Sequence, residues 1–146
     1  MNWKDVAIGD LLSLNSLKVA RNNLQYEIDA IETNLYNIKA IDYDRDIVDG
    51  GDQFKSEDVK LDNIVKKEKL KARLNQINTE IEMIDKGMNC LDEIEKKVLD
   101  YFYISRPYNH IRLLMDELHY EKSQVYRLKD EALSNYTAIR YGNINL

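Results

Sequence analysis

Two stretches of this chain place apolar residues at alternating intervals of three and four, and no proline interrupts either of them. The first stretch runs from Leu14 to Ile38 and the second from Leu70 to Leu91. This spacing puts a narrow apolar seam along one side of a helix, as in a coiled coil, and does not fit the two-residue period of a strand. Only five glycines and one proline punctuate the 146 residues, so the sequence predicts an all-α fold built on long helices.

The two seams predict a long antiparallel helical hairpin of the coiled-coil type over residues 1–88. The segment between them, residues 43–58, is acidic, contains the Gly50–Gly51 pair and shows no period, so we expect an exposed loop there. Ser56 would then cap the second helix. Two alternatives are open for the seams. The helices pair only with each other, or they also support self-association, because a two-helix hairpin buries only part of its apolar stripe.

Residues 89–146 show a wider apolar stripe and predict a second domain of three short helices. These helices are expected at about 89–103, 107–118 and 121–136, with Pro107 in the first turn of the second. Two helices joined by three or four residues, with a third helix behind them, follow the helix-turn-helix plan, in which the N-terminal half of the last helix enters the major groove of DNA. The residues expected to face inward from the last two helices are Ile111, Leu114, Met115, Leu118, Val125, Leu128, Ala132, Leu133 and Tyr136.

Charge is divided unevenly along the chain. The net charge is −5, but residues 96–146 contain eight basic and six acidic residues, a net of +2, which leaves −7 in residues 1–95. The acidity therefore belongs to the predicted hairpin. A charge of +2 is small for a DNA-binding domain, because affinity for phosphates rises with the number of contacts. We therefore expect binding to depend on dimerisation, on a few base contacts or on a DNA-bound partner.

A family resemblance covers the C-terminal third of the chain. The stretch LDEIEKKVLDYFYISRPYNHIRLLMDELHYEKSQVYRLKDEALSNY, residues 91–136, resembles region four, the promoter-reading C-terminal region of sigma factors. Val125, Tyr126 and Arg127, followed by Ala132 and Leu133, carry much of it. Within that superfamily the stretch is most similar to the ArpU and RinA group of phage late-transcription activators. The resemblance implies a DNA-binding regulator of phage or prophage genes, with double-stranded DNA as its ligand and RNA polymerase as a further partner.

The resemblance also implies which residues meet DNA. Arg112, on the middle helix, would contact a phosphate, and Gln124 would flank the reading surface of the last helix. Lys129 shares the outer side of that helix. The residues that would face base edges or nearby phosphates are Lys122, Ser123, Tyr126 and Arg127.

Some of these residues have an ordinary structural alternative. Arg127 can pair with a guanine or, within its helix, with Glu131 four residues on. Lys122 and Lys129 either meet phosphates or lie on a solvated face. The chain also has His119 and Glu121 where such units usually have a small turn residue and a serine or threonine cap.

The composition argues against several classes of function. Cys90 is the single cysteine, and neither it nor His110 or His119 has the neighbours that a zinc site needs, so we expect Cys90 to be a small core residue. The chain lacks the motifs of hydrolases, nucleotide-binding enzymes and metalloproteases, so we expect no catalytic residue, metal or cofactor. With no signal peptide and no membrane-spanning segment in the sequence, we expect a cytoplasmic protein.

Two other functions fit the sequence. A phage DNA-packaging adaptor of the small-terminase type also combines a helix-turn-helix with a helical oligomerisation region, but it would form a ring of many subunits. A protein interaction module that has lost DNA binding would instead capture a host protein through the acidic hairpin.

Overall fold

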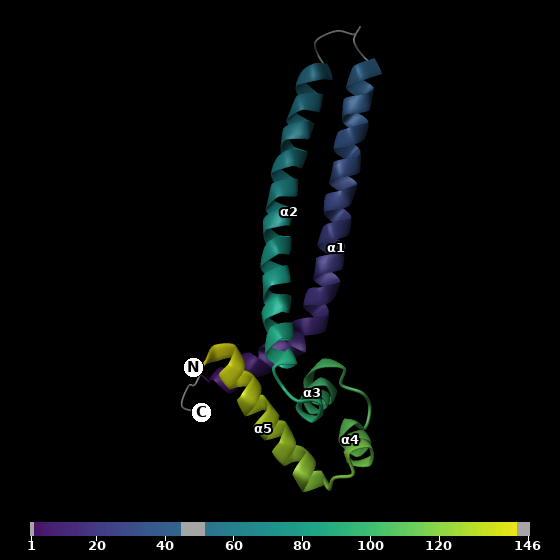
Figure 1. Ribbon diagram of the computed structural model, residues 1–146. Helices are drawn as coiled ribbons and strands as arrows, with labels where there is room; N and C mark the ends of the chain where they lie inside the picture. The colour runs from purple at the N-terminus through teal and green to yellow at the C-terminus, as the bar shows by residue number, and fades with distance from the viewer. Residues whose placement is uncertain (1, 45–51, 143–146) are drawn as a thin grey trace. The chain divides into compact units, whose positions relative to one another are not determined.

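The computed structural model describes residues 2–44 and 52–142, with side chains described in residues 2–36 and 57–142 (Figure 1). Every regular element in the described part of the chain is helical, which confirms the all-α prediction. The elements are α1 (Trp3–Asp44), α2 (Asp52–Asn89), α3 (Glu93–Leu99), the short π-helix η1 (Asp100–Ile104), α4 (His110–Leu118) and α5 (Lys122–Tyr141).

Contacts divide the chain into two compact units. The first contains Met1–Lys18 together with Thr79–Leu146, and the second contains Val19–Asn78. The start of α1 and the end of α2 thus belong with the C-terminal helices. These units do not test whether a separately folding domain begins at residue 89, so the boundary between residues 88 and 89 remains a prediction.

In the second unit, α1 and α2 run side by side in opposite directions (Figure 1). Their predicted seam residues are shielded from solvent: Ile28 is 2% exposed, Ile31 7% and Ile77 2%. Lys67 also lies on the seam, where its Nζ atom is 3.1 Å from Oε1 of Glu32 on α1. Apolar burial therefore joins the two helices at one end of the unit, and an ion pair supports the seam farther along.

The acidic segment at residues 43–58 is more helical than expected. Because α1 continues to Asp44 and α2 begins at Asp52, the prediction of a loop was wrong at both ends of the segment. Ser56 lies inside α2, so the prediction that it caps this helix was also wrong. The rest of the segment, including Gly50–Gly51, lies outside the described residues.

In the first unit, α2 and α5 approach each other closely. The Tyr136 side chain is fully buried, and a Cβ atom built on Gly87 would lie 2.9 Å from its Cε2 atom. Gly87 therefore neither ends nor caps α2, which continues to Asn89. Because this residue has no side chain, the tyrosine ring can pack directly against the helix backbone. This contact fixes α5 on α2.

The end of α5 is held by the first turns of α1. The Tyr141 hydroxyl donates a hydrogen bond to the carboxylate of Asp10, and Nε of Arg140 lies 3.7 Å from the same carboxylate. The Trp3 ring packs against Tyr141 with 5.0 Å between centroids. Burial, with the Asp10 carboxylate adding to it, raises the pKa of Tyr141 to about 12. α5 is thus held at its C-terminal end as well as at Tyr136.

We predict opposite effects for alanine at two helix-interior glycines. Gly87→Ala should lower the free energy of unfolding by about 1–3 kcal/mol, because the buried Tyr136 ring must move. Gly9→Ala is the matched control, since no atom lies within 4 Å of its added Cβ, and it should raise stability by up to about 1 kcal/mol. Urea denaturation measures both changes. Equal stabilisation by the two substitutions would show that the Gly87 contact is not tight.

Candidate functional site

A small apolar core joins α3, α4 and α5. Val98 from α3, Leu114 from α4 and Val125 from α5 are all 0% exposed and pack together. Partly buried side chains surround them, and these are Tyr101, Phe102, Met115, Leu118, Tyr120 and Leu128. The sides of α4 and α5 that lie opposite this core face solvent.

The turn between α4 and α5 is short and well defined. α4 ends at Leu118, and His119 adopts a left-handed conformation with φ of 59°, a conformation that glycine adopts more readily. The Tyr120 amide donates to the Met115 carbonyl over 3.3 Å. Glu121 precedes α5 in an extended conformation, and its amide donates to Oε1 of Gln124 over 3.2 Å. His119 and Glu121 thus fill the turn and cap positions that the sequence assigned to them, and Gln124 supports the cap.

Three predicted helix limits were wrong. The first helix of this region begins at Glu93 rather than near residue 89, where α2 ends. α4 begins at His110 rather than at Pro107, because Arg106 and Asn109 have φ values of 49° and 55°, which no right-handed helix accepts. α5 continues from Tyr136 to Tyr141, where contacts with α1 stabilise its last turn. These shifts leave the predicted site residues on the same two helices.

Most of the predicted DNA-binding residues share one exposed region. The first two turns of α5 expose Lys122, Ser123, Gln124, Tyr126 and Arg127, and Arg112 is exposed on α4. Tyr126 is 38% exposed. In the described part of the chain no ion pair joins Arg127 to Glu131, so the guanidinium is available to a ligand.

Lys129 lies in a different environment from the other predicted residues. Its Nζ atom is 2.8 Å from Oδ1 of Asp130, 5.7 Å from the centre of the Phe102 ring and 5.8 Å from that of Tyr126. Only 21% of its side chain is exposed. The hydrogen bond to Asp130 holds the pKa of Lys129 above its ordinary value. Lys129 therefore supports the α5 surface from within.

The aromatic cluster around Lys129 is a feature that sequence reasoning missed. Phe102 packs edge-on against His110 at 4.8 Å and against Tyr126 at 5.9 Å between ring centroids. Phe102 comes from η1, where the Ser105 amide bonds to the Asp100 carbonyl five residues back, over 2.8 Å. The run of aromatic residues at 101–103 was the only signal in the sequence, and it did not indicate a π-turn.

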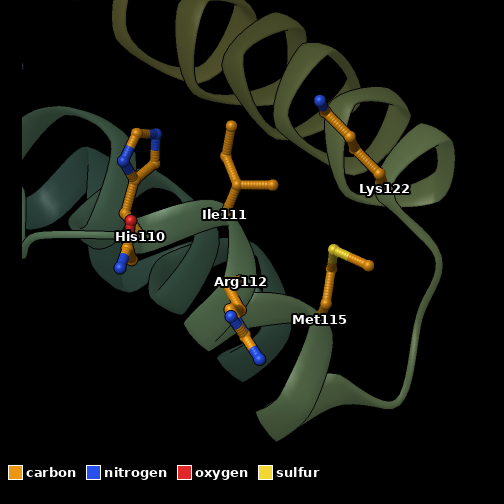
Figure 2. A pocket seen from close by; sticks show the side chains of 6 residues that line it. His110, Ile111, Arg112, Met115 and Lys122 are labelled. Carbon is orange, nitrogen blue, oxygen red and sulfur yellow. The ribbon is translucent and has the colours of Figure 1, made fainter.

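A groove between α4 and the start of α5 is lined in part by Arg112 and Lys122. It has a volume of about 550 Å³ and is lined by Asn109, His110, Ile111, Arg112, Met115 and Lys122. Figure 2 shows Ile111 and Met115 on the side of α4 that faces α5, with Arg112 pointing away from them. The groove thus has an apolar floor with basic side chains at its margin.

The side of α4 that bears Glu117 is tied to α3 and η1 by a polar network. Nζ of Lys97 lies 2.8 Å from Oε2 of Glu117, and the Tyr101 hydroxyl donates to the same carboxylate over 2.9 Å. The hydrogen bond from Lys97, followed by that from Tyr101, lowers the pKa of Glu117. The same hydrogen bond to Glu117 raises the pKa of Lys97. The Glu117 charge is therefore engaged by its own chain.

Three further observations bear on other kinds of site. Among the described residues, His, Cys, Asp and Glu form no group of three or more that could hold a metal ion. None of the described helices combines the length and apolar character needed to cross a bilayer. Cys90 is exposed in the break between α2 and α3, so the prediction that it is a core residue was wrong.

The fold and this surface define an all-α protein in which α4, a three-residue turn and the start of α5 present a basic and aromatic face. The chain belongs to the DUF1492 family, described as a protein of unknown function, which it matches over residues 37–137. The match includes every predicted DNA-binding residue. No curated protein and no solved structure matches the chain significantly.

We predict that Glu117→Gln alters how stability depends on pH. A carboxyl group with a lowered folded-state pKa stabilises the protein above its unfolded-state pKa, and that contribution is lost as the pH falls through the folded-state value. The wild type should therefore melt at a higher temperature than the variant at pH 7, and the difference should shrink by pH 3. Thermal unfolding followed by circular dichroism measures it. In a Lys97→Met background the pH-dependent difference should be much smaller, and an unchanged difference would contradict the assignment.

Proposed function

We propose that this protein is a DNA-binding transcriptional regulator of phage or prophage genes, and that it binds promoter DNA through the start of α5. One observation carries the proposal: the first two turns of α5 are exposed, bear Lys122, Tyr126 and Arg127, and follow α4 after a three-residue turn. In helix-turn-helix proteins this part of the second helix contacts base edges. The sigma-like sequence of residues 91–136 supports the same conclusion.

The proposed contacts differ in what they contribute. Arg127 has no ion-pair partner among the described residues, so its guanidinium is free to form a bidentate pair with guanine, worth about 1–3 kcal/mol of discrimination. Lys122 and Arg112, at the margins of the groove, supply charge for phosphates and little sequence information. Ser123 and Gln124 lie beside them, and Lys129 acts by supporting Tyr126.

The small positive charge of this region bears on how binding is achieved. Affinity for phosphates depends on the number of contacts and falls with salt, so a net of +2 over residues 96–146 gives one copy weak binding. The proposal therefore includes a second contribution from the hairpin, through self-association or through contact with RNA polymerase. A regulator of this kind acts in the cytoplasm.

The test is to recover and footprint the DNA that the full chain binds among fragments of the genome that encodes it. Arg127→Ala should weaken binding to the recovered site about tenfold and relax the preference for one base pair. Lys122→Ala should weaken binding to all sequences and reduce the salt dependence by about one ion. Lys86→Ala, an exposed lysine on α2 paired with Glu82, is the control and should bind as the wild type does.

Several outcomes would contradict the proposal. If the chain protects no site, or if Arg127→Ala and Lys122→Ala both bind DNA as the wild type does, α5 is not the part that recognises DNA. Absence of any salt-dependent DNA binding, together with a host protein that co-purifies, would favour the interaction module. A ring of many subunits in light scattering would favour a packaging adaptor.

A further inference from the structure

The part of α2 that follows the undescribed segment turns a polar side toward α1. Lys60, Asn63 and Lys67 are half-buried at positions i, i+3 and i+7, and Lys67 bonds to Glu32 of α1 over 3.1 Å. Farther along the same stripe, apolar residues take over, and Ile77 is 2% exposed. Near Lys67 the two helices are therefore joined by an ion pair.

The apolar residues of this stretch lie on another side of α2. Leu61 is 60% exposed, and Ile64 and Val65 are each 47% exposed. Spacings of three and four residues place these three side chains on one stripe of the helix, which continues to the exposed Glu68. A helix that buries lysines within its own chain and leaves a leucine, an isoleucine and a valine in water has its apolar side directed at something outside the chain.

Charge along α2 indicates what that partner is. Before the apolar stripe, residues 57–62 contain three acids and one lysine, a net of −2, and after it residues 66–73 contain five basic residues and one acid, a net of +4. Two copies of this helix in the same direction would place like charges together. Two copies in opposite directions would place the acidic end of each against the basic end of the other.

We propose that a second copy of this chain covers the stripe, with the two α2 helices antiparallel about a two-fold axis near Ile64 and Val65. Residues at equivalent flanking positions of antiparallel helices meet each other. Glu57, Ile64 and Lys71 are seven residues apart, as are Asp62 and Lys69, so each set lies on one flank. The axis then places Ile64 against Ile64 of the second copy, Glu57 against its Lys71 and Asp62 against its Lys69. Such an interface is isologous and closes after two subunits.

The interface is small, so the dimer should be dynamic. Only three apolar side chains per copy lie at its centre, which corresponds to the small, weak class of interfaces. We expect the full chain to pass from monomer to dimer between about 1 and 100 μM. This inference does not rest on the DNA-binding proposal, because the pairing is measured without DNA.

Charge exchange gives the decisive test, read by sedimentation equilibrium on the full chain. Asp62→Lys and Lys69→Asp should each weaken the dimer at least tenfold, because like charges then meet on that flank. The double variant should restore it, since both opposite-charge contacts re-form. In a parallel dimer each of these residues would meet its own copy, so this pattern of loss and restoration would not follow. Monomer at every concentration up to 200 μM, or a double variant no better than the single ones, would overturn the proposal.

A crosslinking experiment checks the position of the axis. In a Cys90→Ser background, Ile64→Cys should form a disulfide-linked dimer on mild oxidation, because residue 64 meets its own copy. Val59→Cys is the matched control, since Val59 is 49% exposed on the same helix but lies off the stripe, and it should crosslink poorly. Equal crosslinking at both positions would contradict the proposed axis. Circular dichroism checks that each variant keeps its helix content.

Discussion

The contact between Val98, Leu114 and Val125 is the interaction on which the C-terminal region depends. α3 has 7 residues and α4 has 9, and helices this short are not stable alone in water. Their burial against α5 is therefore what makes them helical. The same contact sets the angle of the three-residue turn and leaves the first two turns of α5 exposed. The candidate site is a consequence of this core, which is built from side chains other than those that the site exposes.

The two halves of α5 have different roles. Its first half carries the exposed basic and aromatic residues, and its second half is held by Tyr136 against Gly87 and by Tyr141 against Asp10. A helix fixed at its C-terminal end presents its N-terminal end at a defined angle to the core, which a base-reading surface requires. The aromatic cluster below Lys129 adds support from the side. The residues that hold the C-terminal half of α5 are therefore different from those proposed to contact DNA.

Sequence alone was enough for the helical class and for much of the core, because these follow from periodicity. Val125 and Leu114 were predicted to face inward, and both are fully buried. The cap at Glu121 was also predictable from its place in the motif. The role of Lys129 could not be predicted, because the partly buried position of its side chain depends on the π-turn. That turn brings Phe102 beside Tyr126. Pro107 failed as a helix start because Asn109 takes a left-handed conformation, which Asn adopts more readily than most residues but which the sequence around Pro107 did not indicate.

Chemical-shift mapping shows most directly whether the start of α5 contacts DNA. The full chain, labelled with ¹⁵N, would be titrated with a duplex that contains its selected site and with a scrambled duplex of the same length. The account predicts that shifts specific to the selected duplex gather at residues 122–127 and around Arg112, while residues 19–78 change little. Shifts confined to residues 19–78, or identical responses to both duplexes, would contradict it.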